Sequence, residues 1–389
     1  MSDFLTRNRL VLAKIEVTSG TDPVPTPAID AVLVEEPRGS PQMELEQTDE
    51  VTGSLDTTQS IVGGGFMQRT QRFFAKGSGV PGTAPEYTPY LQAAALGLTT
   101  LAADSVGTAQ AGAAGTITLA VAAPATDLTG FVIATTGGTG GAPVQERVIT
   151  AYNTATKVAT IYPNWTVTPD VTTTYAVRAG NLFVPVSTAL KTVTDYLYKK
   201  NSGAGNALLE KLVGAAANLS FAVQTRQTGK FTVTLRGMLA APTSVANPTG
   251  AVFDATRPRP LRDADAFLGS QRVCFRNFTL DWGNEIVQAD CPGEVYGFEP
   301  AQVVSRKPTG RLNPQLLTLS ARDAFADMVA GTVQKLWLSW GETAGNRVSL
   351  YLPGLVYTGK EDDDLDGIGA DGLPFEAVGV DSWCYLTFF

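Results

Sequence analysis

The chain has 389 residues, of which 44% are hydrophobic and 17% are charged, a net charge of −8, and no histidine. The acidic balance argues against a nucleic-acid-binding protein, which would carry a basic surface that neutralises phosphates. Without histidine, Ser-His-Asp and Cys-His nucleophilic sites and His-ligated metals are excluded, so we expect no enzyme and no cofactor.

The length suggests two or three domains of about 150 residues each. Three cysteines at irregular spacing do not form a disulfide framework, so we expect folding in a reducing cytosol. No apolar run reaches the roughly 18 residues of a membrane span, and the N-terminus lacks a signal-peptide core. We therefore expect no membrane insertion.

The N-terminal region combines a proline-rich arm with an acidic stretch. Three prolines within five positions cannot join a sheet interior, so this segment is predicted to run over a surface, either as a tethered terminus or as an arm that grips a neighbour. Met43–Ser60 is predicted to form a hairpin or a long loop. The residues that mark these two segments are Pro23, Pro25, Pro27, Glu44, Glu46, Asp49 and Glu50.

A predicted strand, Phe66–Phe74, leads into a loop rich in glycine and proline and then into a predicted helix, Tyr90–Leu98. Glycines such as Gly77 and Gly79 permit a positive φ, and the prolines fix the turns. The helix is the first in the chain, so the loop marks the transition from strand to helix.

Residues 104–180 are rich in Thr, Ala and Gly and almost uncharged. Short β-branched runs separated by turns indicate a small all-β module. Because this composition interrupts the pattern on either side, we interpret the module as an insertion whose ends lie close together.

Clean alternation of apolar and polar residues returns after residue 180 and predicts three strands, which include Leu219–Gln224 and Phe231–Arg236. The intervening stretch GAGNALLEKLVGAA is predicted to be a loop with a helical turn. Residues 241–268 are Pro-rich without a period and are interpreted as a linker or a second arm. Further strands follow, including Val303–Lys307 and Leu316–Ser320, with a second helix at Ala321–Val329.

The order of strands, helix and strands occurs twice once the module is removed. We therefore predict a mainly β protein with a first domain (1–103 and 181–250), an inserted module (104–180), a linker (251–270) and a second domain (271–389). Each domain would have the size of an ordinary single domain. The alternative is one large mixed β domain.

Three segments together resemble the tail tube (major tail) protein of siphoviruses, which are long-tailed bacteriophages. They are LAKIEVTSGTDPVPTPAIDAVLVEEP, FFAKGSGVPGTAPEYTPYLQAAALG and GAAANLSFAVQTRQTGKFTVTLRG, of which the second is the most specific. The resemblance covers about a quarter of the chain outside the module. Ala95 and Leu96 depart from it, since relatives often carry a polar or Cys residue before the glycine.

The resemblance implies two tandem tail-tube β-sandwich domains, each packed on one helix. It also implies a structural virion protein whose rings stack into the hollow tail tube through which genomic DNA passes into the host. Rings of three chains with pseudo-sixfold symmetry are expected, with hexamers as the alternative, and tape measure and tail-end proteins would be partners. Assembly would begin in the host cytoplasm, and the assembly-interface residues would include Gly77, Gly79 and Tyr87 with the arm and acidic residues named above.

The inserted module would project outward as decoration. A carbohydrate-binding or adhesin role for the whole protein, acting through this module, is the alternative function. Because duplex DNA must pass without sticking, the channel is expected to be electronegative.

Two motifs near the C-terminal end are weak. GLVYTGKE has the spacing of a phosphate loop but lacks its Ser or Thr. Asp362, Asp364 and Asp366 have the spacing of calcium ligands, but Leu373 stands where a bidentate glutamate belongs. A solvated acidic loop is the favoured interpretation, and no metal site is predicted.

Overall fold

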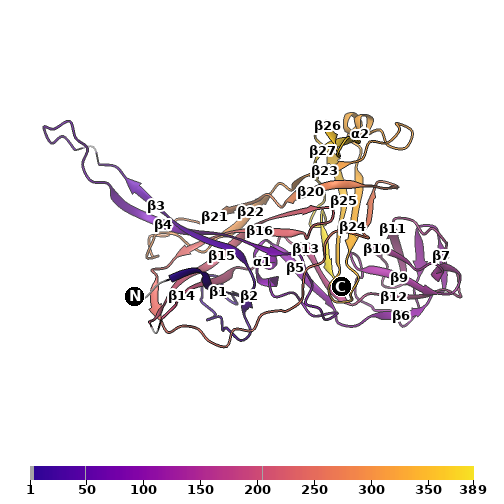
Figure 1. The fold of residues 1–389 in the computed structure, drawn as a ribbon, viewed down its shortest axis with the longest axis horizontal. Helices are drawn as coiled ribbons and strands as arrows, with labels where there is room; N and C mark the ends of the chain where they lie inside the picture. Colours follow the sequence, from indigo (N-terminus) through magenta and orange to yellow (C-terminus); the bar gives the residue numbers. More distant parts are fainter. Residues whose placement is uncertain (1–3, 49, 204) are drawn as a thin grey trace.

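The computed structural model describes residues 4–48, 50–203 and 205–389 and is mainly β (Figure 1). Two short α-helices occur in the described residues, and no described helix is long and apolar enough to cross a membrane. Most strands belong to one hydrogen-bonded network that spans both halves of the chain.

The first half supplies ten strands and one helix to this network. They are β1 (Phe4–Ile15), β2 (Ala31–Val32), β3 (Glu35–Glu46), β4 (Ile61–Phe74), α1 (Thr88–Ala93), β5 (Leu96–Leu101), β13 (Gly180–Pro185), β14 (Val193–Asn201), β15 (Ala207–Gln224), β16 (Lys230–Leu239) and β17 (Thr243–Val245).

The second half supplies nine strands to the same network, one helix, and a separate two-stranded ribbon, β21–β22. Its elements are β18 (Asp265–Leu268), β19 (Gln271–Arg272), β20 (Phe275–Asp281), β21 (Asn284–Val287), β22 (Gln302–Arg306), β23 (Thr309–Pro314), α2 (Ala324–Ala330), β24 (Gln334–Trp340), β25 (Val348–Tyr357), β26 (Glu361–Asp364), β27 (Gly369–Ala377) and β28 (Tyr385–Phe388).

One order of strand pairing occurs in both halves. In the first half it is β1–β14–β15–β16–β4–β3, with β17 beside the start of β15. In the second half it is β18–β24–β25–β27–β23–β20, with β28 beside the start of β25. A helix follows β4 in the first case and β23 in the second, so corresponding elements also agree in chain order.

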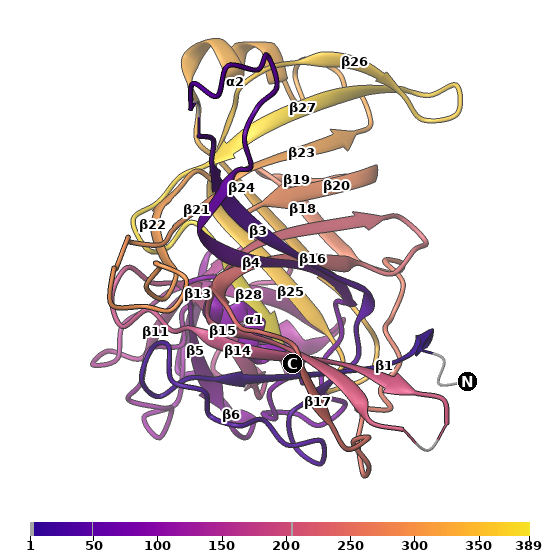
Figure 2. The same ribbon diagram turned by 90° about the vertical axis from the view of Figure 1, so that its left-hand side faces the viewer.

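The two halves join through strands. Ser220–Gln224 at the end of β15 pairs antiparallel with Asn277–Asp281 of β20. The result is a continuous run of eight strands, β3–β4–β16–β15–β20–β23–β27–β26. Figure 2 shows this run from β26 and β27 at the top, through β23 and β20, to β16 and β4.

One hydrophobic core lies beneath both halves. It contains Phe73, Tyr90 and Phe231 from the first half, and Trp282 and Trp340 from the second. The alternation in β16, which places Phe231, Val233 and Leu235 in this core, is what the sequence predicts for a strand with one buried face.

A buried polar network lies within the core. Asp195 and Arg69 are both fully buried and form an ion pair. The carboxylate of Asp195 also accepts hydrogen bonds from Tyr90 Oη at 2.5 Å and from Gln71 Nε2 at 3.1 Å. Burial, with the nearby charge of Asp195, raises the pKa of Tyr90 well above its usual value, so this phenol remains a donor. The network ties β4, β14 and α1 together.

Residues Ser105–Val177 form a separate seven-stranded sheet with its own core. Its elements are β6 (Ser105–Thr108), β7 (Ala111–Ala113), β8 (Thr116–Thr118), β9 (Val132–Gly137), the 3₁₀ turn η1 (Thr139–Gly141), β10 (Gln145–Tyr152), β11 (Val158–Tyr162) and β12 (Thr174–Val177). The module leaves and rejoins the main sheet between β5 and β13, which pair from Leu96↔Pro185 to Leu101↔Gly180.

The module also packs on the second half of the chain, to the right of β24 and β25 in Figure 1. Val148 and Tyr162 of the module cluster with Trp337 and Tyr351, both of which are buried. Arg347 pairs with Glu146 through both terminal nitrogens of its guanidinium group. The inserted module is therefore docked against strands from the other half of the chain.

Three predicted elements differ from the structure. GAGNALLEKLVGAA lies mostly in strand β15 because pairing on both edges and burial of Leu209, Leu212 and Ala215 override its helix propensity. Leu316–Ser320 is not a strand. The first helix ends at Ala93 because Ala95 is left-handed (φ 59°), and residues from Leu96 onward extend into β5.

The two helices differ in burial. In α1, Tyr90, Leu91 and Ala93 are buried in the core. In α2, only Ala324 is buried, and Phe325 and Val329 are 60% and 70% exposed. Asp323 caps α2 by accepting from Ala326 N at 2.9 Å, and Gly331 ends it in the left-handed conformation.

Candidate assembly interface

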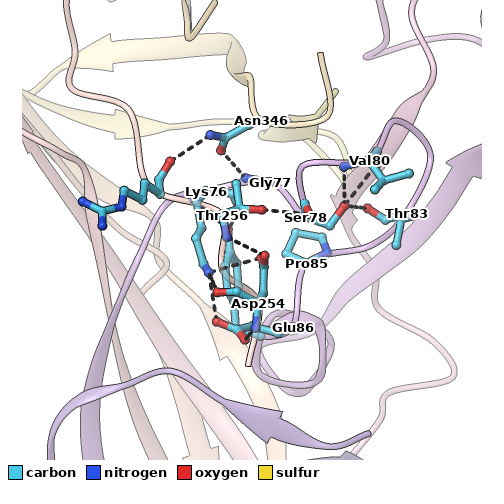
Figure 3. Close-up of polar contacts among 12 residues, drawn as sticks. Lys76, Gly77, Ser78, Val80, Thr83, Pro85, Glu86, Asp254, Thr256 and Asn346 are labelled. Carbon is cyan, nitrogen blue, oxygen red and sulfur yellow. Dashed lines mark hydrogen bonds and ion pairs between the residues drawn. The ribbon is translucent and has the colours of Figure 1, made fainter. Parts of the chain in front are cut away.

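The loop between β4 and α1 is held by a buried ion cluster (Figure 3). Lys76 Nζ lies 3.3 Å from a Glu86 oxygen and 3.2 Å from an Asp254 oxygen, and the lysine and Glu86 side chains are nearly inaccessible. The same nitrogen donates to Asp254 O at 3.0 Å. Asp254 belongs to the predicted linker, so the cluster fixes that linker against the loop.

Gly77 and Gly79 contact the second half of the chain directly. Gly77 N donates to Asn346 Oδ1 at 3.1 Å, and Gly79 N donates to Gly345 O at 2.9 Å. A Cβ on Gly77 would lie 2.0 Å from Gly345 O, so no larger residue fits without backbone movement. Asn346 Nδ2 in turn donates to Arg257 O. The loop therefore holds together the two halves and the segment between them.

Tyr87 is fully buried in the same region. Its hydroxyl donates to Lys76 O at 2.6 Å, and its ring stacks on Phe73 with centroids 4.5 Å apart. Burial raises the pKa of Tyr87 well above its usual value. Of the three loop residues proposed for the assembly interface, Tyr87 contributes to the core of its own chain and not to a surface.

Lys76→Met should loosen the linker, because Glu86 and Asp254 would keep buried charges without their cation. Loss of one partner from a buried ion cluster typically costs about 3 kcal/mol. We expect faster amide exchange in residues 251–257 and an unchanged rate in the inserted module, measured by hydrogen–deuterium exchange. Lys191→Met, at an exposed lysine, is the matched control. Equal exchange in both variants would show that the cluster does not hold the linker.

The proline-rich segment lies against its own chain. Pro25 is buried, Pro23 and Pro27 are half-buried, and Pro27 O accepts from Val252 N. Nearby, burial opposes the charged form of Asp22, but hydrogen bonds from Tyr196 and Lys211 outweigh it and lower the pKa of this carboxyl. The segment follows the surface without joining a sheet, as the prolines predict.

The acidic residues near the N-terminal end lie on a long hairpin that projects from the body (Figure 1). Glu44 and Glu46 are exposed in β3, and Glu50 is exposed in the connecting loop. Asp49 lies outside the described residues. Apolar side chains on the same hairpin are also uncovered, including Leu45, Val51 and Leu55.

The eight-strand run has an unpaired edge at each end. Among the described residues, β3 pairs only with β4, and β26 pairs only with β27. Unpaired edges present free backbone donors and acceptors to another chain. Neither edge was identified from the sequence, because an edge is defined by which strands pair and not by composition.

The calcium candidate forms the β26–β27 hairpin instead of a metal loop. Asp362 and Asp364 lie in β26, whereas Asp366 in the turn pairs with Arg276 at 2.9 Å. Among the described residues, no group of three His, Cys, Asp or Glu side chains is placed to hold a metal ion.

No protein-family model matches the chain, and a search of curated protein sequences found no match.

Proposed function

We propose that this chain is a structural virion protein of a long-tailed bacteriophage, which self-assembles into rings that stack into a hollow tail tube. The observation that carries the proposal is the repeated pairing order, with its strand-to-strand junction and its two open edges. In this proposal the two halves are tandem tube domains, and the β15–β20 junction is the contact that recurs between chains.

Association through the two edges is head-to-tail, because β3 and β26 are different surfaces. A head-to-tail contact makes a ring when its rotation closes. Three chains would supply six lobes and twenty-four strands. At a strand spacing of about 4.8 Å and a tilt of about 40°, that wall would be about 150 Å around and about 48 Å across, wide enough for duplex DNA.

The face of the run that points away from the core would line this channel. It carries small neutral side chains, such as Thr70, Ser220, Thr232, Thr234 and Thr279. Two of its basic residues are paired, Arg311 with Glu361 at 2.6 Å and Lys230 with Glu35 at 2.7 Å. Arg72, which lies opposite Thr232 on the same face, forms no ion pair with a described residue. We therefore propose a nearly neutral wall, in place of the strongly electronegative one expected from net charge, which would let DNA slide without binding phosphates.

The β3–β4 hairpin would contact the next ring in the stack. Val51 and Leu55 near its tip are completely exposed, which is typical of residues that a partner covers. Tape measure and tail-end proteins would be further partners, with assembly in the host cytoplasm and the virion as the final location.

Electron microscopy of the purified protein tests this function. We expect hollow tubes of stacked rings, with three chains and six lobes in each ring. Six chains per ring would contradict the trimer, and a protein that remains monomeric at high concentration would contradict the proposed function.

A further inference from the structure

The internal junction indicates how one chain contacts the next. Ser220–Gln224 is the last part of β15 before the turn into β16, and its free edge is covered by β20. Glu361–Asp364 (β26) is the counterpart of this segment in the second half, because it comes directly before the turn into β27 as Ser220–Gln224 comes before the turn into β16. The counterpart of β20 is β3, because β20 pairs with β23 as β3 pairs with β4.

The turn after β15 also has a specific position at the internal junction. It lies against the segment that precedes β18, where Arg226 N donates to Leu261 O at 2.8 Å and Thr225 bridges to Leu261. Because β18 pairs with β24 as β1 pairs with β14, the counterpart of that segment is the beginning of β1. The equivalent turn of another chain, residues 365–368, would then lie between β1 and β3.

A groove of about 910 Å³ lies between β1 and β3 in the structure. Five basic residues line it: Arg7, Arg9, Arg38, Arg72 and Lys230. Two carboxylates in its wall are already paired, Glu35 with Lys230 and Glu36 with Arg38. Arg7 and Arg72 form no ion pair with any residue that the structure describes. The groove therefore has an excess of positive charge.

The β26–β27 hairpin has the opposite charge. Five of the six residues 361–366 are acidic. Asp362 is completely exposed, and its lysine partner lies 3.6 Å away. Asp364 is also exposed, and Asp366 pairs with Arg276 while its side chain stays 78% exposed. The repeat places the β26–β27 hairpin of one chain at the groove between β1 and β3 of another, and these two surfaces have opposite charge.

The helices support the same arrangement. Within the chain, β21 covers the end of α1, where Asn284 Nδ2 donates to Ala94 O at 3.0 Å. The counterpart of β21 is the outer part of β3, which exposes Met43 and Leu45. The counterpart of α1 is α2, which exposes Phe325 and Val329. The exposed apolar residues of α2 and those of the outer part of β3 would therefore face each other in the corresponding contact between two chains.

We propose that the acidic β26–β27 hairpin of one copy binds the arginine-lined groove beside β3 of the next copy, with the outer part of β3 covering α2. This contact rests on the proposed function, since it specifies which surfaces join in the ring. Opposite charges across such a contact steer association and fix the strand register.

Charge reversal tests the contact. Asp362→Lys with Asp364→Lys, and separately Arg7→Glu with Arg38→Glu, should each raise the protein concentration needed for rings by about tenfold or more, because like charges would face each other. A chain with all four substitutions should assemble at nearly the wild-type concentration. Asp127→Lys on the inserted module is the control and should assemble normally. Electron microscopy and sedimentation measure assembly, and circular dichroism checks folding.

A cross-link provides a second measurement that does not require a loss of assembly. Arg38→Lys keeps the positive charge, and a carbodiimide should then join the introduced amine of one chain to a carboxylate in residues 361–366 of another. Mass spectrometry of mixed isotope-labelled chains identifies such links. Assembly unaffected by the hairpin reversal, or rings of the Arg38→Lys variant without this cross-link, would overturn the contact and leave the proposed function standing. Absence of rings in the wild-type protein would overturn the function itself.

Discussion

Arg69→Met should lower the free energy of unfolding by about 3–5 kcal/mol, because it leaves Asp195 as a buried charge without its cation. Both side chains are completely inaccessible to solvent. Gln71 and Tyr90 would still donate to Asp195, but neutral donors do not replace a guanidinium. Denaturant unfolding followed by tryptophan fluorescence measures the change.

The double variant Arg69→Met with Asp195→Asn separates charge from packing. It removes both charges and keeps an oxygen that can accept from Tyr90, so we expect it to recover at least half of the lost stability. A double variant as unstable as the single one would attribute the loss to the shape of the Arg69 side chain, and the argument from a buried charge would be wrong.

Removal of the inserted module should make the chain aggregate, although its ends are ready to be joined. Leu101 and Gly180 are paired neighbours, so a two-residue Asn-Gly turn in place of residues 102–179 would close β5 and β13 into a hairpin. The deletion would, however, uncover Trp337 and Tyr351, each of which contributes about 1.5–3 kcal/mol by burial. We expect lower thermal stability and larger particles in light scattering.

A matched variant tests that reason. The same deletion with Trp337→Thr and Tyr351→Thr removes the uncovered aromatic surface and should remain dispersed. Rings formed by this variant would mean that assembly does not need the module, whereas host binding that is present in the wild type and lost with the module would favour the adhesin alternative. A simple deletion as stable as the wild type would contradict the docking of the module.

Local sequence patterns correctly predict those strands whose residue types suit the surroundings that the fold gives them. Phe231–Arg236 alternates between apolar and polar residues because one face of β16 covers the core. The β-branched runs of residues 104–180 form strands because β-branched side chains favour the extended backbone. The residues of Ala207–Leu212 favour a helix, but the segment is a strand because two neighbouring strands, β14 and β17, form hydrogen bonds with its backbone. Local propensity is weaker than pairing on both edges.

The candidate interface is harder to predict than the elements. Arg7 and Arg38 are far from Lys230 in sequence. They line the same groove only because β1, β3 and β16 belong to one sheet. The acidic run at residues 361–366 is conspicuous in the sequence, which favours a solvated loop, and only the pairing with β27 makes it an edge strand. Gly77 and Tyr87, which the sequence suggests for the assembly interface, have partners within the chain itself.

The strand junction between Ser220–Gln224 and Asn277–Asp281 has a consequence for how a ring would begin. Its two surfaces are tethered by one polypeptide, so they meet at a high effective concentration and without a bimolecular encounter. A six-lobed ring of three such chains needs only two bimolecular encounters, because its third contact closes within one complex. At equilibrium the concentration of rings would therefore follow the third power of the free chain concentration instead of the sixth, which favours complete rings when little protein has been made.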